Sequence, residues 1–521
     1  MLLLHSVGET TVRAAASGAS TRGTPLVRTL EARISVARVE NHGAASSMAV
    51  TDAGRTRWQA LAVCLVAGGM CLLDVSIVNV ALPSIRTGLS ADDSDIQWVV
   101  AGYSLAFGVA LVPAGRLGDA RSRRAVFMAG VAVFTLASAA CGASQSALWI
   151  SVARVVQGFG GGMITPQVSG FIQNLFKGPE RGRAFGLFGA TIGVSTAIGP
   201  LLGGLLVQLG GQDLGWRLVF YVNLPIGLLL LVLARRWLPV VPPGRRQSLD
   251  PVGVLLFAAA TVLVLLPVVE GRQGQSLASR PWWLLGVAAT VFALFFGWER
   301  YWARRGRETL VDLSLSRVTS YVFGVGLGMF YFAGFTSIFI ILTLYLQNGL
   351  GYSALQAGLT QMPFAVGSAV AAFVAGRIVE RFGRALVVGG LVAVTVALVS
   401  IDLVVPHLDG DVGLKVAPLL LLAGAGGGCV ISPNVTLALD EVDPVRAGAG
   451  GGLLQTFQRV GSAIGVAVVL AQFFDRLASS RGDAAEALSA ALHTTIGLIV
   501  LALALGLVDL GRRRLTPEPR G

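Results

Sequence analysis

Apolar residues of this chain fall into long runs separated by short polar connections, from residue 58 to residue 510. A helix needs about 20 consecutive apolar residues to cross the hydrocarbon core of a bilayer. Lipid cannot satisfy backbone hydrogen bonds, so such runs form helices. The pattern predicts an all-α polytopic membrane protein with fourteen transmembrane helices. The expected spans are residues 58–82, 96–114, 125–144, 147–170, 184–208, 217–234, 251–269, 282–299, 321–346, 354–375, 385–405, 416–438, 448–474 and 489–510.

Composition agrees with this reading. The chain has 521 residues, of which 54% are hydrophobic and 13% charged, whereas soluble domains carry about 25% charged residues. The net charge is +12, but the basic residues lie in connections between apolar runs, where they orient helices rather than bind nucleic acid. The four cysteines lie inside apolar runs without metal-binding or disulfide spacing. We expect no nucleic-acid partner, no metal and no cofactor.

The distribution of lysine and arginine predicts the orientation. With the N-terminus in the cytoplasm, the inside connections hold roughly three times as many basic residues as the outside connections. An even number of spans then returns the C-terminus to the same side. We expect a multi-pass protein of the plasma (inner) membrane with both termini cytoplasmic.

Two connections repeat each other. GRLGDARSR follows the second predicted span and GRIVERFGR follows the tenth. The matched positions are Gly115 with Gly376, Arg116 with Arg377, Asp119 with Glu380, and Arg123 with Arg384. Repeats of this kind are one plan for transporters, with the site near mid-membrane between the halves. A compositional likeness between two basic loops is the alternative.

The repeat suggests a division of the chain. Two six-helix bundles are expected at 58–234 and 321–510, joined by a linker at 235–320 that carries two extra transmembrane helices. Residues 1–57 are polar and arginine-rich, and we expect a disordered cytoplasmic arm there. Residues 511–521 form a short cytoplasmic tail.

The first predicted span contains one carboxylate, Asp74. A charge near the middle of a membrane helix costs about 2.5–3.5 kcal/mol on insertion scales, so it marks a functional site. Burial favours the neutral form of a carboxylic acid, which suits reversible protonation. A structural acid paired with a hydrogen-bond donor is the alternative.

Arg154 lies in the fourth predicted span, roughly 10 Å below the outer surface at 1.5 Å per residue. Asp74 lies in the same outer half, so the two side chains could meet. An arginine beside a carboxylate favours the charged acid, and its withdrawal favours the neutral acid. Gln157 lies about one turn further along the same face. An arginine that snorkels to the interface is the alternative.

Four motifs occur in order and resemble those of the major facilitator superfamily, in its fourteen-span drug:proton antiporter branch. LLDVSIVNVALPSI resembles the first-helix motif, with its acid at Asp74. GRLGDARSRR resembles the loop motif G-x-L-[A/G]-D-R-x-G-R-[K/R], although Ala120 and Ser122 replace the usual arginine and glycine. RVVQGFGGG resembles the fourth-helix motif, with its arginine at Arg154. GPLLGG resembles the antiporter motif, with Ser195 where a glycine is usual.

The resemblance implies roles for these residues. Asp74 and Arg154 would couple transport to protons. The loop residues Gly115, Asp119, Arg123, Glu380 and Arg384 would gate alternating access. The antiporter motif would be Gly199, Pro200, Gly203 and Gly204, where small residues let helices approach and proline permits a bend. WRLVFYVNLPIG at 216–227 opens the sixth span as in this branch.

Other intramembrane polar residues are candidates for substrate contact, because such residues usually face a bundle interior or a cavity. The candidates are Asn79, Gln157, Gln455 and Arg459. For Arg459, a structural pairing is an equal alternative. Glu270, Glu299 and Asp402 lie at predicted span ends, where we expect exposure to water.

We therefore expect a monomeric proton-coupled antiporter that exports lipophilic, cationic or amphipathic small molecules. The chain has no P-loop, so the energy would come from a gradient. A proton-coupled importer or uniporter of a small nutrient on the same fold is the alternative. A membrane-embedded enzyme or sensor is a further one, but the four histidines are dispersed and form no catalytic cluster.

Overall fold

The computed structural model describes residues 25–240, 250–269, 281–307, 309–310, 313–408, 410–443 and 447–515. All regular elements within these ranges are helices. The chain divides into two compact units, Met1–Trp58 and Gln59–Gly521, and the second unit holds the apolar helices.

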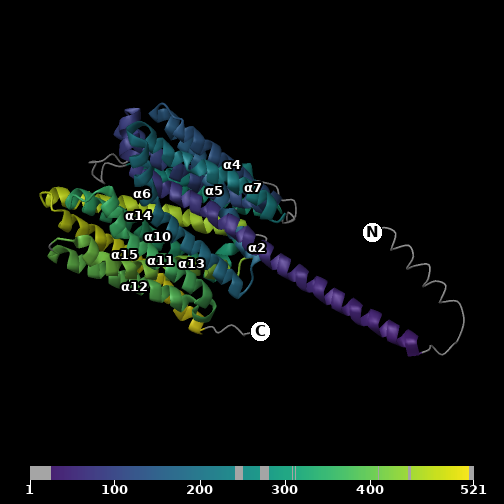
Figure 1. The fold of residues 1–521 in the computed structure, drawn as a ribbon. Coiled ribbons are helices and arrows are strands. Elements are labelled where there is room, and N and C mark those ends of the chain that lie inside the picture. Colours follow the sequence, from purple (N-terminus) through teal and green to yellow (C-terminus); the bar gives the residue numbers. More distant parts are fainter. Residues whose placement is uncertain are drawn as a thin grey trace. The chain divides into compact units, whose positions relative to one another are not determined.

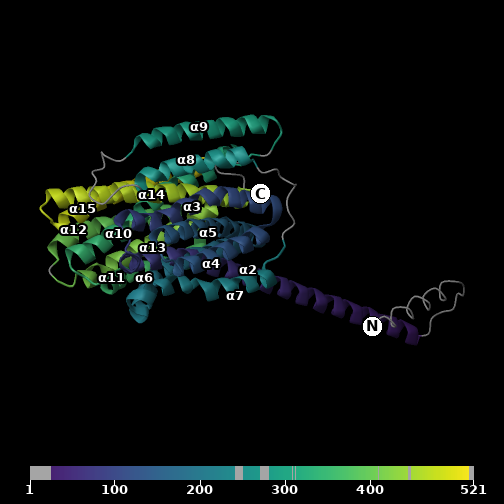
Figure 2. The ribbon, with the colours of Figure 1, turned by 90° about the horizontal axis from the view of Figure 1, so that it is seen from above.

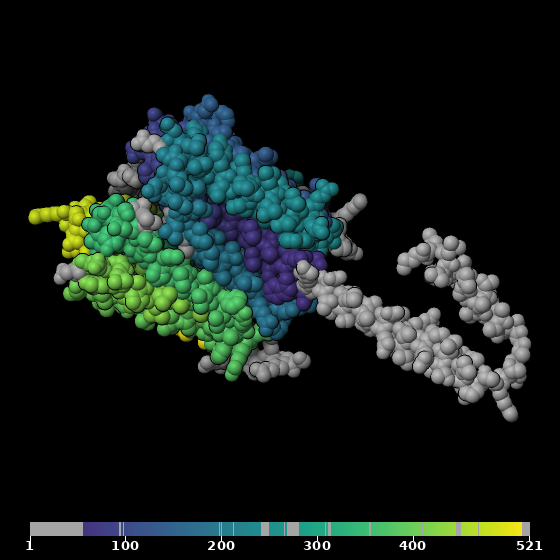
Figure 3. Space-filling view, in the orientation of Figure 1, coloured from purple at the N-terminus to yellow at the C-terminus, as the bar shows by residue number. Residues whose placement is uncertain are grey.

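Six helices form what we call the N-terminal set: α2 (Pro25–Leu89), α3 (Asp93–Leu117), α4 (Arg123–Gly142), α5 (Ala147–Leu175), α6 (Pro179–Tyr221) and α7 (Asn223–Trp237). Two further helices follow: α8 (Pro251–Val269) and α9 (Trp283–Arg304). Six more form the C-terminal set: α10 (Thr319–Leu344), α11 (Ala354–Phe382), α12 (Arg384–Val404), α13 (Val412–Leu439), α14 (Ala447–Ser479) and α15 (Ala484–Leu515). Figure 1 and the space-filling view of Figure 3 show the two sets side by side.

Twelve segments of the described residues are long and apolar enough to cross a membrane. One of them, Trp98–Gly142, contains most of α3 and all of α4, because the π-helical turn η1 (Gly118–Ser122) joins these helices without a break. The apolar stretch Pro251–Val264 of α8 is shorter than these twelve segments. The structure is therefore all-helical with twelve candidate spans, and the count of fourteen is not confirmed.

Helix α2 extends back into the segment where we expect the cytoplasmic arm. Helix α2 begins at Pro25, so the later part of the predicted arm is helical, while residues 1–24 lie outside the described residues. Between residues 26 and 57 the chain has no proline and is rich in alanine and arginine, which are strong helix formers.

Small residues let the helices approach closely. Helices α3 and α5 meet where Gly158 leaves no room for a side chain against the backbone of Tyr103. Helices α6 and α11 meet where a Cβ on Gly376 would lie 2.5 Å from the Gly182 carbonyl oxygen. Apolar side chains gain little from leaving lipid, so close backbone contact is a main source of helix association in membranes.

Helices α8 and α9 pack on one flank of the bundle. Figure 2 shows α8 between α9 and the rest of the molecule, beside α14. An apolar cluster of Phe257, Phe295, Leu310 and Val112 joins this hairpin to α3. The prediction that Glu299 is exposed is wrong, because the side chain is fully buried and accepts a hydrogen bond from the Leu310 amide at 3.2 Å. Glu270 lies outside the described residues.

A buried ion pair ties together the C-terminal set. Arg384 at the start of α12 donates from Nε to Asp509 Oδ2 of α15 at 2.5 Å, and from Nη1 to Asn434 Oδ1 of α13 at 2.6 Å. Asn434 in turn donates to the Gly324 carbonyl of α10 at 2.8 Å. Arg384, which is 2% exposed, thus links α12 to α13 and α15, and Asn434 extends the network to α10.

We predict that Arg384→Met strongly destabilises the protein. The substitution breaks the buried pair of Arg384 with Asp509, and breaking a buried ion pair by removing one partner costs about 3–5 kcal/mol. Thermal unfolding of the detergent-purified protein measures the effect. The double variant Arg384→Met/Asp509→Leu should recover much of the loss, because both charges are then absent. Equal instability of the single and double variants would contradict this account.

Candidate functional site: a buried ion pair beside a central cavity

The Asp74 carboxylate lies at the centre of a buried hydrogen-bond network inside the N-terminal set. Oδ2 pairs with Nη1 of Arg154 on α5 at 2.5 Å. Oδ1 accepts from Nε2 of Gln157 at 2.8 Å and from Nδ2 of Asn223 on α7 at 2.9 Å. The structure therefore brings together the three residues Asp74, Arg154 and Gln157 that the sequence had singled out.

The network extends to two more helices. Arg154 donates from Nε to the Val99 carbonyl of α3 at 3.0 Å, and its guanidinium stacks 4.2 Å from the ring centroid of Tyr103. Asn223 also donates to Oγ of Ser138 on α4 at 3.1 Å. A carboxylate inside apolar surroundings is tolerated only with partners of this kind. The network thus explains how the charge is held at this depth.

Sequence reasoning missed Asn223, Ser138 and Tyr103 as partners. Asn223 lies inside the stretch WRLVFYVNLPIG, which had been noted only as a match to the sixth span. An asparagine in an otherwise apolar run was the available signal. Ser138 and Tyr103 gave no signal, because either residue type also occurs singly in membrane helices.

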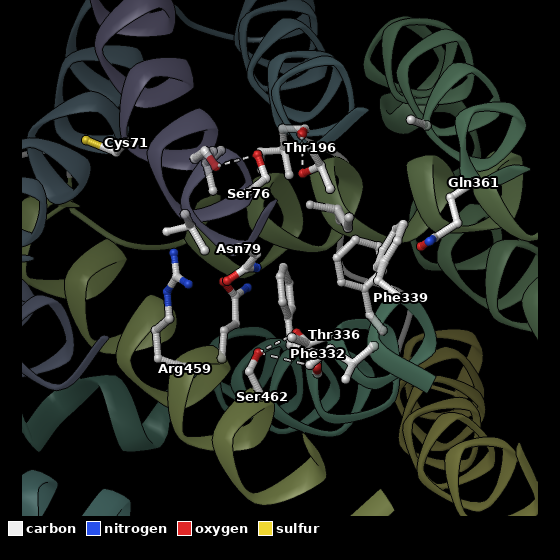
Figure 4. Close-up of a pocket in the computed structure, with 18 of the residues that line it drawn as sticks. Cys71, Ser76, Asn79, Thr196, Phe332, Thr336, Phe339, Gln361, Arg459 and Ser462 are labelled. Carbon is white, nitrogen blue, oxygen red and sulfur yellow. Dashed lines mark hydrogen bonds between the residues drawn. The ribbon is translucent and has the colours of Figure 1, made fainter. Parts of the chain in front are cut away.

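A cavity of about 600 Å³ lies between the N-terminal and C-terminal sets. This volume is within the range of about 300–1,000 Å³ found for small-molecule sites. Phenylalanines and aliphatic side chains form most of its wall, and amide and hydroxyl side chains form about a third of it. Figure 4 shows Phe332 and Phe339 on one side of the cavity, and Ser76 and Asn79 of α2 facing them.

The substrate-contact candidates divide into residues that line the cavity and residues that do not. Asn79, Gln455 and Arg459 line it. Gln157 is fully buried and belongs to the Asp74 network instead. Asp74 is also fully buried and is not among the lining residues, although Cys71, one turn away on α2, is.

The two sets touch at one end of the bundle, which we call the η1 end because η1 lies there. Arg181 pairs with Asp440 at 3.0 Å, and Gln173 donates to the Leu439 carbonyl at 2.8 Å. Gln455 donates to Ser169 Oγ at 3.2 Å. These contacts join the last turns of α5 and the start of α6 to the end of α13 and the start of α14, so the η1 end is closed.

The cavity reaches the opposite end, which we call the η4 end after the π-helical turn η4 (Tyr345–Gly349). Its lining includes Pro83 near the end of α2, Gln347 of η4, and Gly358 in the first turns of α11. No described residue of η1 or of the 176–178 turn lines it. The structure is therefore open toward the η4 end.

The loop motif lies at the closed end. Asp119 in η1 is buried and pairs with Nη2 of Arg123 at 2.7 Å, and Arg123 donates to the Gly170 carbonyl at 2.7 Å. Gly115 lies in the last turn of α3. In the second copy, Arg384 pairs with Asp509 rather than repeating the local pair, and Glu380 is exposed near Gly178 of the other set.

The antiporter motif packs α6 against α2. Gly199 leaves no space beside the Ser76 hydroxyl, and a Cβ on Gly203 would lie 2.9 Å from the Ile77 carbonyl oxygen. Gly204 faces open space. Pro200 lies in α6, but its side chain is outside the described part. Two of the motif's glycines thus bring α6 against the helix that carries Asp74.

The sequence family is decided by a profile of the Major Facilitator Superfamily, which matches residues 64–466. The chain belongs to the major facilitator superfamily. This superfamily member is 37% identical over 428 residues to the probable actinorhodin transporter of Streptomyces coelicolor, covering 81% of this chain and 73% of that relative. It is 34% identical over 402 residues to the multidrug resistance protein Stp of Mycobacterium tuberculosis, covering 77% and 73%.

A solved structure supports the fold. The human organic anion transporter MFSD10 aligns with a TM-score of 0.61 at 16% identity, covering 86% of this chain and 99% of that chain. The chain is thus a multi-pass membrane transporter of small molecules and not an enzyme. Its bacterial relatives imply the plasma membrane.

We predict that cysteines placed along the cavity react with a maleimide much faster than cysteines at the closed end. In detergent-purified protein, Gln361→Cys should label at least about tenfold faster than Gln173→Cys, because a side chain buried to 2% exposure reacts only when the structure opens.

The unsubstituted protein, whose four cysteines are free, gives the background for this measurement. Mass spectrometry of time points reports the two rates. Equal labelling of Gln361→Cys and Gln173→Cys would show that the η1 end is not closed in solution.

Proposed function

We propose that this transporter is a proton-coupled antiporter that exports lipophilic small molecules by alternating access. The relatives reported above are named as a probable actinorhodin transporter and a multidrug resistance protein. These names support export of drug-like compounds. A cavity with a largely aromatic and aliphatic wall suits such compounds. Asp74, with Arg154, would be the proton-coupling site.

One observation supports coupling between substrate binding and proton binding. Helix α2 presents Asp74 to the buried network on one side, and Cys71, Ser76 and Asn79 to the cavity on another. A ligand that displaces α2 therefore also displaces the carboxylate relative to Arg154. Substrate and proton can influence each other through this helix without touching.

The protonation states of Asp74 favour different packing. The charged carboxylate is held by Arg154, Gln157 and Asn223. The neutral acid loses the ion pair, which weakens the hold of α2 on α5 and α7. A proton taken up from one side and released to the other would thus bias the transporter between its two states.

We assign the η1 end to the cytoplasm. Most lysines and arginines in connections lie at this end, as the positive-inside rule requires of cytoplasmic loops. Both termini are then cytoplasmic, and the structure corresponds to an outward-facing state. Arg181 with Asp440 would help to hold it closed, and the Asp119–Arg123 pair would keep η1 in place against α14.

The proposal includes fourteen spans and a monomer. The segment Trp98–Gly142 includes parts of two helices, and α8 has 19 residues, so α2 to α15 would supply fourteen crossings. The domains would be bundles at 58–234 and 321–510, with a linker at 235–320 and cytoplasmic ends at 1–57 and 511–521. This architecture supports the assignment to the fourteen-span drug:proton antiporter branch.

We predict that Asp74→Asn abolishes proton-driven transport while leaving the protein in the membrane. The amide keeps the size of the side chain and one acceptor oxygen, but it cannot bind and release a proton. The probes are two flat aromatic compounds, anthraquinone-2-carboxylate and its methyl ester. The measurement is uptake of each probe into everted membrane vesicles, with and without a proton uncoupler.

The control is Asp475→Asn, which makes the same change at an exposed position of α14. Undiminished uncoupler-sensitive uptake by Asp74→Asn would reject the role of this carboxylate. Uptake only into right-side-out vesicles would reject export and identify an importer or uniporter.

A further inference from the structure

The cavity contains one charged side chain among its described lining residues, and that charge is positive. Arg459 lies on α14, twelve residues after Ala447, which is about 18 Å along the helix. Its guanidinium lies 4.5 Å from the ring centroid of Phe107 on α3. Figure 4 shows this side chain extending from α14 toward α2.

Arg459 forms no ion pair with any residue that the structure describes. The described cavity wall contains no aspartate or glutamate. Asp74, the carboxylate on the neighbouring helix, is fully buried and is held by Arg154, Gln157 and Asn223. The two guanidinium groups therefore differ: Arg154 has a carboxylate partner, and Arg459 faces the cavity without one.

A guanidinium stays charged at every physiological pH, so Arg459 cannot relieve its position by losing a proton. The face of Phe107 compensates part of the charge through a cation–π contact. Carboxylates and other planar oxyanions satisfy a guanidinium better, through two parallel charge-assisted hydrogen bonds. The unpaired cation thus points to an anionic group on the ligand.

The surroundings fit the rest of such a ligand. The amides of Asn79, Gln455 and Gln458 also line the cavity and can hydrogen-bond polar substituents. Phe332, Phe335 and Phe339 supply aromatic faces on α10 for flat rings. An acid group at Arg459 and an aromatic body against α10 would both be satisfied at once.

We propose that the cavity selects lipophilic organic anions, with an aromatic or polycyclic body and a carboxylate or ionised phenol that pairs with Arg459. This inference rests on the proposed export function and replaces the cationic substrate expected from the sequence. Exchange of a monoanion for an incoming proton moves two positive charges inward. Both the pH gradient and the inside-negative potential then drive export.

The test compares anthraquinone-2-carboxylate with its methyl ester, which has the same ring system without the charge. Binding to the purified full chain in nanodiscs is measured by equilibrium dialysis. The native protein should bind the acid at least about tenfold more tightly than the ester, since a charge-assisted bidentate pair exceeds a neutral hydrogen bond by this order.

Variants show whether Arg459 recognises the acid group of the ligand or only packs in the cavity wall. Arg459→Gln should remove the preference for the acid and leave the affinity for the ester unchanged, whereas Arg459→Lys should keep part of the preference. Arg476→Gln, which changes an exposed arginine of the same helix, should keep all of it. If Arg459→Gln weakens acid and ester equally, or if the native protein shows no preference, Arg459 is a packing residue and the inference is wrong.

Failure of the anion site and failure of proton-coupled export give different results in these experiments. Uncoupler-sensitive vesicle uptake of the neutral ester, without preferential binding of the acid, would support export and overturn the anion site. A preference for the acid that depends on Arg459, without uncoupler-sensitive uptake, would support the anion site and overturn proton-coupled export.

Discussion

The pairing of Asp74 with Arg154 inside a low-dielectric bundle is the interaction on which the N-terminal set depends. Neither charge can be left alone there, because an uncompensated buried charge costs several kcal/mol. The pair therefore demands partners, and α2, α3, α4, α5 and α7 supply them through Val99, Ser138 and Asn223. One carboxyl group thus links five helices through hydrogen bonds.

Helix α2 lies between the buried Asp74 network and the central cavity. Its buried side holds a carboxylate shielded from the cavity, and its other side contributes the short polar side chains Ser76 and Asn79 to the cavity wall. The glycines Gly199 and Gly203 let α6 press against the same helix. Because α2 is held so closely, a displacement of its cavity side would also move the Asp74 carboxylate rather than be absorbed by loose packing.

The two sequence repeats use arginine differently. In the first copy, Arg123 pairs with Asp119 four residues earlier, and the pair fixes a local turn. In the second copy, Arg384 pairs with Asp509 from the last helix, and the pair joins distant segments. The same loop pattern thus gives a local brace in one set and a long-range tie in the other, since the partner depends on which helix packs alongside.

The sequence by itself determined the helical class, most span positions and the residues of the ion pair, because lipid imposes helix length and penalises any charge within a span. It did not reveal Asn223 or Asp509 as partners, the burial of Glu299, or that Gln157 faces the network while Arg459 faces the cavity. Those facts depend on the rotation and contact of helices far apart in the chain. Periodicity marks which residues share a face, but only packing decides what that face meets.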